Sequence, residues 1–171
     1  KDNGMVRDVF RTRNMRALPG VVGLGQVRYP TAGNASSEEE AQPFYVNAPF
    51  GIVMVHNGNL TNAKQLRREL ADTDHRHTNT ESDSEVLLNV LAHELARVSS
   101  GARLTDDNVF AAVRAVHKRI KGSYAVIALI AGYGLLAFRD PFGIRPLCMG
   151  KGADGTIMVA SESVALEGTT H

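Results

Sequence analysis

The chain has 171 residues, 43% of them hydrophobic and 22% charged, and its formal net charge is +1. This length suits one domain with one sizeable core, and the near-neutral charge argues against a nucleic-acid partner. One cysteine, Cys148, excludes an internal disulfide framework and favours a reducing, cytoplasmic compartment. The longest apolar stretch, residues 124–138, is too short to span a bilayer, so we expect no membrane partner.

The first apolar segments, residues 4–10 and 21–27, have the pattern of strands. The second strand would end at Arg28, and Pro30 would keep the residue before it extended, so that Arg28 leaves in a fixed direction. A guanidinium there, with the Thr31 hydroxyl three residues on, is suited to gripping a carboxylate. An ordinary surface arginine is the alternative.

A possible catalytic loop follows. Residues 51–55 predict a short buried strand and residues 61–70 an amphipathic helix, so we expect residues 56–60 to form a loop between rigid elements. In that loop the Asn57 carboxamide lies beside the Gly58 backbone N–H, which no side chain shields. Two neutral donors that converge are what a developing oxyanion needs. A plain Asn-Gly turn is the alternative.

Two capping pairs are predicted at the starts of helices, Asn62 with Gln65 and Ser82 with Glu85. If Ser82 is the N-cap, Asp83 is the first helical residue. Its carboxylate there either complements the helix dipole or binds an ammonium group of a substrate.

From residue 122 onward the pattern changes to strands joined by short turns, which favours antiparallel hairpins. The predicted strands cover residues 124–131, 135–139, 145–149 and 156–160. Strands, then helices, then strands again indicate an α+β layered fold and not a Rossmann alternation.

Several strings, in order, resemble one family. They are residues 28–33, 56–62, 82–85, 138–147 and 160–163. Together they resemble the class II glutaminase domain of the glutamine phosphoribosylpyrophosphate amidotransferases (amidophosphoribosyltransferases), and the resemblance covers nearly the whole chain. It implies the N-terminal-nucleophile hydrolase fold, an αββα four-layer sandwich, here incomplete at its N-terminus. It also implies that residues 1–171 are a single partial glutaminase domain, without the phosphoribosyltransferase domain.

The resemblance also implies a mechanism. In that family an N-terminal cysteine attacks the side-chain amide of L-glutamine, and the ammonia converts phosphoribosylpyrophosphate to 5-phosphoribosylamine in the first step of de novo purine biosynthesis. By motif, Asn57 and Gly58 resemble the oxyanion hole, Arg28 with Thr31 the α-carboxylate site, and Asp83 the α-ammonium site. Loss of Asn57 is then expected to lower turnover by roughly a hundredfold or more. Loss of Arg28 or Asp83 should mainly weaken binding.

The chain departs from the family at its start, where residue 1 is Lys, and Cys148 lies inside a predicted strand. We therefore expect the nucleophile-bearing segment to be missing and the chain as printed to be inactive. Two alternatives stay open. One is another amidotransferase of the same fold that makes an amino sugar or asparagine, and the other is a non-catalytic glutamine-binding or structural domain.

No metal or other cofactor is expected in this chain, because His75 and His77 have no third ligand at useful spacing. The resemblance places Mg²⁺ in the missing phosphoribosyltransferase domain and implies that the full-length protein is a homo-oligomer.

Overall fold

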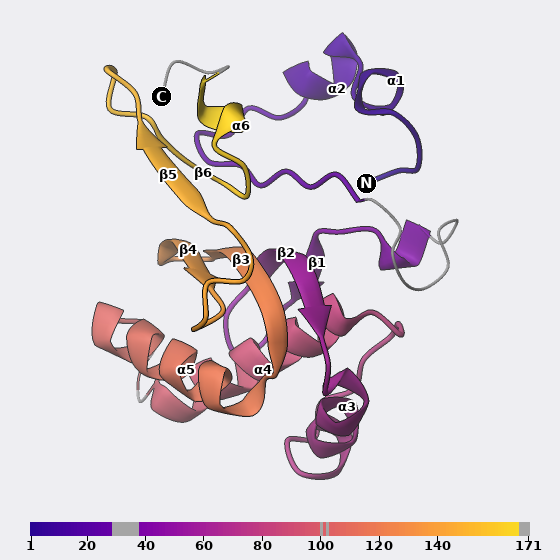
Figure 1. Ribbon diagram of the computed structural model, residues 1–171, viewed down its shortest axis with the longest axis vertical. Helices are drawn as coiled ribbons and strands as arrows, with labels where there is room; N and C mark the ends of the chain where they lie inside the picture. Colours follow the sequence, from indigo (N-terminus) through magenta and orange to yellow (C-terminus); the bar gives the residue numbers. More distant parts are fainter. Residues whose placement is uncertain (29–37, 100, 102, 168–171) are drawn as a thin grey trace.

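A four-stranded antiparallel sheet lies at the centre of the molecule (Figure 1). The computed structural model describes residues 1–28, 38–99, 101 and 103–167. Across the sheet the strands follow the order β1 (Phe44–Val46), β2 (Ile52–Leu60), β3 (Gly122–Ile130) and β4 (Gly134–Arg139). The long strands β2 and β3 pair along their whole length, from Ile52 opposite Ile130 to Leu60 opposite Gly122.

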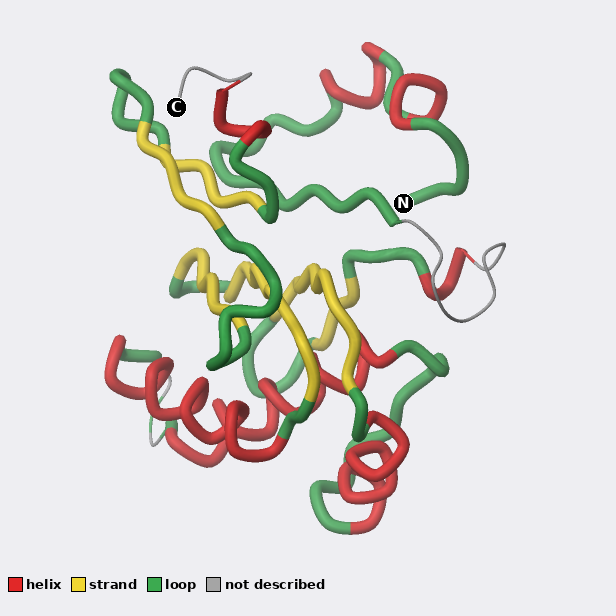
Figure 2. The backbone as a smooth tube through the Cα atoms, viewed as in Figure 1, coloured by secondary structure: helices red, strands yellow, loops and turns green. Residues whose placement is uncertain are grey.

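Helices cover one face of this sheet, as Figure 2 shows in red against the yellow strands. They are α3 (Ala63–Asp72), α4 (Asp83–Val98) and α5 (Asp106–Arg119). The middle helix, α4, packs against α3, α5 and the sheet, and its residues from Ser84 to Ala92 are all buried.

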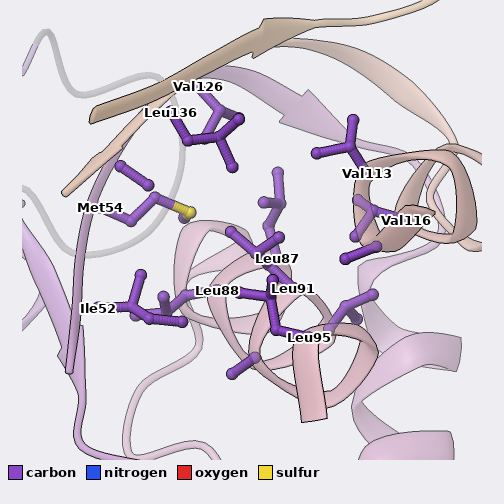
Figure 3. Packing of buried hydrophobic residues seen from close by; sticks show 14 of the residues in the cluster. Ile52, Met54, Leu87, Leu88, Leu91, Leu95, Val113, Val116, Val126 and Leu136 are labelled. Atoms are coloured by element: carbon purple, nitrogen blue, oxygen red, sulfur yellow. The ribbon is translucent and has the colours of Figure 1, made fainter. Parts of the chain in front are cut away.

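The core lies between the sheet and α4 (Figure 3). Strand residues that face the helices meet leucines of α4 and valines of α5; they include Ile52, Met54, Val126, Leu136, Leu87, Leu88, Leu91, Leu95, Val113 and Val116. Because strand side chains alternate, the even-numbered residues of β2 face this core and the odd-numbered ones face the opposite side. That opposite side carries the candidate site.

The remaining elements lie away from the helical layer (Figure 1). They are α1 (Val6–Val9), α2 (Thr12–Arg16), the 3₁₀ turn η1 (Glu38–Glu40), α6 (Val164–Glu167) and the antiparallel hairpin of β5 (Cys148–Lys151) with β6 (Ile157–Ala160). In the described part of the chain, no helix has the length and apolar character needed to cross a membrane.

The predicted α+β class is confirmed, as are the helices at α3, α4 and α5 and the strands at β3, β4 and β6. The strand predicted over residues 145–149 lies later, since β5 begins at Cys148. Two strand predictions near the N-terminus are wrong. Residues 6–9 form α1, and residues 21–27 form no strand. A strand needs a hydrogen-bonded neighbour, and residues 21–27 pair with neither of the two sheets that the described residues form.

The loop predicted for residues 56–60 is also wrong, because β2 continues through it to Leu60 and stays paired with β3. A two-residue connection, Thr61 and Asn62, then leads into α3. An Asn-Gly pair usually marks a turn, but here the glycine allows the backbones of β2 and β3 to approach each other closely.

Both predicted capping pairs are wrong in detail. The Asn62 carboxamide caps no helix; it donates to the Arg119 carbonyl and accepts from the Lys121 N–H, which ties the start of α3 to the end of α5. Ser82 is the N-cap of α4, as predicted, but its side chain accepts from Ser84 N–H. Glu85 accepts hydrogen bonds from residues 79–80 of the preceding loop instead of closing a capping box.

Candidate active site

A cleft of about 1350 Å³ opens on the side of the sheet away from the helices. Arg28, Asn57, Gly58 and Asp83 all line it, so the structure brings these four predicted site residues together. Thr31 lies outside the described residues. The cleft exceeds the ~300–1,000 Å³ usual for small-molecule pockets, so an amino acid would fill only part of it.

The backbone of β2 has one paired and one open edge at this cleft. Gly51 and Thr61, at its two ends, bond to residues that flank β3. Since hydrogen-bonded and non-hydrogen-bonded positions alternate in an antiparallel pair, the odd-numbered residues of β2 bond to β3. The N–H groups of His56, Gly58 and Leu60 therefore point to the other edge, beyond the end of β1.

Side-chain oxygens accept hydrogen bonds from two of these three N–H groups. The His56 N–H donates to Gln42 Oε1, and the Leu60 N–H donates to Asp83 Oδ2 at 2.8 Å. Between them, the Gly58 N–H has no acceptor among the residues that the structure describes. It is an open donor at the rim of the cleft.

Glycine is required at position 58. Its φ of +146° lies in a region that side-chain-bearing residues rarely adopt. A Cβ would lie 2.8 Å from the Tyr124 Cα and closer still to the Ser123 carbonyl oxygen, so β3 leaves no room for one. The same close approach fixes the direction of the Gly58 N–H.

Asn57 precedes this amide, on the face of the sheet that forms the cleft. Its side chain is half-buried, and its carboxamide has no hydrogen-bond partner in the described part of the chain. An unoccupied carboxamide therefore adjoins an unoccupied backbone N–H. Such a pair can stabilise negative charge that develops on a substrate oxygen.

A buried histidine supports the strand at this point. His56 is 3% exposed, and its Nδ1 lies 3.0 Å from Ser84 Oγ. Burial lowers the pKa of His56, the Asp83 carboxylate opposes this shift and the Arg145 guanidinium adds to it. Ser84 Oγ also accepts from Gln42 Nε2 at 3.2 Å. The buried imidazole thus supports β2 directly before Asn57 and Gly58.

The two charged groups predicted to bind substrate already have partners. Arg28 Nη2 lies 3.2 Å from Glu40 Oε2, in a pair whose side chains are 26% and 12% exposed. Asp83 uses one oxygen for the Leu60 N–H, while the other lies 4.0 Å from His56 Nδ1. A bound carboxylate would have to share the guanidinium with Glu40.

Arg145, which also lines the cleft, is held by the turn before it. Its N–H donates to Asp140 Oδ2 at 2.9 Å. Burial alone would raise the pKa of Asp140, but backbone N–H donors from Arg145, Ile144, Tyr124 and Phe142 together lower it. The ionised carboxylate therefore fixes the path of the chain from β4 towards β5.

Sequence reasoning missed Gln42, Glu40 and the roles of His56 and Ser84. His56 and Ser84 lie inside the strings that resemble the family, so the motifs themselves could have drawn attention to them. Gln42 and Glu40 carried no such signal, because their positions depend on how β1 pairs with β2.

Comparisons with known proteins agree with this picture. The family described as glutamine amidotransferase domain matches residues 31–168. The chain is 58% identical to amidophosphoribosyltransferase of Pseudomonas aeruginosa and 56% identical to that of Escherichia coli, in each case over 98% of this chain and 34% of the relative. It is 38% identical to that of Methanocaldococcus jannaschii, over 97% of this chain and 33% of the relative. The chain thus spans about a third of the length of these relatives.

Solved structures are similar as well. Glutamine phosphoribosylpyrophosphate (PRPP) amidotransferase from B. subtilis, complexed with ADP and GMP, matches 83% of this chain with a TM-score of 0.60 and 30% sequence identity. The match covers 28% of that chain. A second structure, of the allosteric regulatory enzyme of purine biosynthesis, matches the same share with a TM-score of 0.61 and 30% identity.

Proposed function

Because the chain belongs to the glutamine amidotransferase domain family and has the N-terminal-nucleophile hydrolase fold, we propose that it is the glutamine-hydrolysing part of an amidophosphoribosyltransferase. It would supply ammonia to phosphoribosylpyrophosphate and so yield 5-phosphoribosylamine, in the first step of purine biosynthesis. Relatives of that name, which match almost the whole chain, support this choice over amino-sugar or asparagine synthesis.

One observation carries the hydrolytic part of the proposal: the Gly58 N–H and the Asn57 carboxamide adjoin each other at the cleft, and neither has a hydrogen-bond partner among the described residues. When a thiolate attacks the glutamine side-chain carbonyl, a C–S bond forms and the C=O electron pair moves to oxygen. The two donors stabilise that oxyanion. Collapse of the oxyanion breaks the C–N bond, and the nitrogen takes up the proton that the thiol gave up and leaves as ammonia. Water then hydrolyses the thioester to glutamate and restores the thiol.

The rest of the cleft fits the other end of glutamine. Its α-carboxylate would meet the Arg28 guanidinium, and its α-ammonium group would meet Oδ1 of Asp83, the oxygen that does not accept from the Leu60 N–H. Asp83 would then have two tasks, since its other oxygen holds the Leu60 N–H. We therefore revise the expectation that loss of Asp83 mainly weakens binding: it should disturb β2 as well.

Cys148 does not supply the thiolate in this proposal, because it lies in β5 and does not line the cleft. We infer that the nucleophile belongs to a segment before Lys1 and that a phosphoribosyltransferase domain follows, which agrees with the longer relatives. No group of three or more His, Cys, Asp or Glu side chains among the described residues could hold a metal ion. We propose, from the resemblance alone, that Mg²⁺ accompanies phosphoribosylpyrophosphate in that second domain.

Two further parts of the proposal rest on the resemblance. The longer protein is cytoplasmic, in keeping with a chain that has one cysteine, and it assembles as a homo-oligomer. Light scattering of the purified longer protein tests the assembly.

The test measures glutamate and ammonia formed from L-glutamine by the longer protein that contains this chain, beside Asn57→Ala and Asn59→Ala. Asn59 is the matched control, because it lies two residues along β2 on the same face. We expect Asn57→Ala to lower kcat by about 10²–10³-fold with little change in KM, since the lost donor acts only as charge develops. Asn59→Ala should stay near the parent.

Ammonium chloride, supplied in place of glutamine with phosphoribosylpyrophosphate, should restore product formation in Asn57→Ala. A folded longer protein that releases no ammonia from glutamine would overturn the proposed function. Equal turnover by Asn57→Ala and the parent would remove the oxyanion role alone.

A further inference from the structure

The side chain of Gln42 takes the place of a backbone strand. β1 pairs with β2 through Phe44 opposite Met54 and Val46 opposite Ile52. Continuing that register by two residues would place Gln42 opposite His56. The Gln42 backbone does not continue β1, which begins at Phe44, but its carboxamide makes the two bonds that a strand would make. Its Oε1 accepts the His56 N–H and its Nε2 donates to the His56 carbonyl at 2.8 Å.

Because a side chain replaces the strand backbone at this position, the Gly58 N–H stays uncovered. Two residues further in the same register, Glu40 would lie opposite Gly58, and the backbone at residue 40 would cover the Gly58 N–H. Instead residues 38–40 form the turn η1, and the Glu40 carboxylate pairs with Arg28. The side-chain amide thus ends the β1 ladder at the last position before the open donor.

The Gln42 carboxamide is itself fixed. Its Nε2 also donates to Ser84 Oγ, near the start of α4, and Ser84 Oγ contacts His56 Nδ1. Gln42 therefore connects the His56 peptide to the helix that carries Asp83. The peptide units on both sides of Gly58 are held from α4, one through Ser84 and Gln42 and the other through Asp83.

We propose that Gln42 is a positioning residue for glutamine hydrolysis, which keeps the Gly58 N–H uncovered and aimed at the developing oxyanion. The inference rests on the proposed function. Gln42 touches no reacting atom; it acts through the His56 peptide and the direction of β2.

The variant Gln42→Met keeps the length of the side chain and removes both hydrogen bonds to His56 and the one to Ser84. In the longer protein we expect kcat for glutamine hydrolysis to fall by about 10–100-fold, because small displacements of an oriented group have effects of that size. KM for glutamine should change less than about threefold, since the substrate-binding charges are untouched. Ser84→Ala keeps both bonds between Gln42 and His56 but removes the Ser84 contacts to Gln42 Nε2 and His56 Nδ1, so it should give a smaller loss in kcat in the same sense.

Asn108→Ala is the matched control. Asn108 is also a carboxamide that bridges backbone groups, from Val98 O to Thr105 N–H, but it does not line the cleft. It should lower the melting temperature and leave kcat per folded molecule unchanged. A merely structural Gln42 would behave in the same way, and that result would overturn the proposal.

Amide hydrogen exchange in the longer protein gives a second readout that needs no activity. The His56 N–H should exchange faster in Gln42→Met than in the parent, while the Leu60 N–H stays protected by Asp83. Unchanged exchange at His56 would contradict the geometry. If the longer parent protein hydrolysed no glutamine, the proposed function would fail, and the exchange result would still show whether Gln42 holds β2.

Discussion

The substitution Gly58→Ala tests the close approach of β2 and β3 directly. Two penalties add at this position: a backbone conformation at φ +146° that alanine resists, and a Cβ that meets the backbone of β3. Backbone strain of this kind costs about 1–3 kcal/mol. Forcing extra volume into a packed site costs about another 1–3 kcal/mol. We expect Gly58→Ala to lower the free energy of unfolding by about 2–6 kcal/mol.

Gly134→Ala separates the two penalties. Gly134 begins β4 with φ +138°, but a Cβ there would meet nothing within 4 Å. It should show the backbone strain alone, so urea denaturation of both variants gives the steric part by difference. Each 1 kcal/mol shifts the melting temperature of a domain of this size by about 2–4 °C. Equal destabilisation of the two variants would refute the argument that β3 requires glycine at this position.

Two further predictions concern stability. Arg119→Met should cost about 3–5 kcal/mol in urea denaturation, because it leaves the buried carboxylates of Asp74 and Glu94 without the guanidinium that lies 2.7 and 2.9 Å away. The control Arg97→Met, which removes an exposed partner of the same Glu94, should cost less than about 1 kcal/mol; equal losses would contradict the role of burial. The free energy of unfolding should also fall as the pH drops below 6.5, the ordinary pKa of histidine. Burial lowers the pKa of His56 and His117 in the folded protein, so the unfolded chain binds protons first as the pH falls, and this favours unfolding. Denaturation at several pH values, with NMR titration of the imidazoles, checks this, and a folded-state midpoint above that of the unfolded chain would contradict it.

The parts of the fold that the sequence predicts well have local patterns. The apolar stripe of α4 specifies a helix and its buried face, and the short apolar runs of β3 and β4 between turns indicate strands, without reference to distant residues. Residues 21–27 have a strand-like pattern too, but a pattern cannot say whether a neighbouring strand is present. The loop prediction for residues 56–60 was wrong for the opposite reason. The local pattern, with its Asn57-Gly58 pair, could not show that β3 pairs with this segment and keeps it in a strand.

The candidate site, too, could be predicted only where local sequence determines it. Motifs predicted which residues gather at the cleft, because those residues lie in short strings whose types and order are distinctive. They could not predict that Arg28 faces Glu40, or that Asp83 holds the Leu60 N–H. Those contacts depend on the register of β1 against β2 and on where α4 begins in space.

The arrangement at β2 also explains how a sheet edge can stay open without fraying. An uncovered strand edge usually recruits another strand or loses its order. Here the amides on both sides of Gly58 are bound by side chains, and β3 holds the whole strand from the other edge. The Gly58 N–H, which has no acceptor in the described part of the chain, is therefore fixed in direction before any ligand arrives. Preorganised donors of this kind need no rearrangement as charge develops, which is the condition under which they contribute most to catalysis.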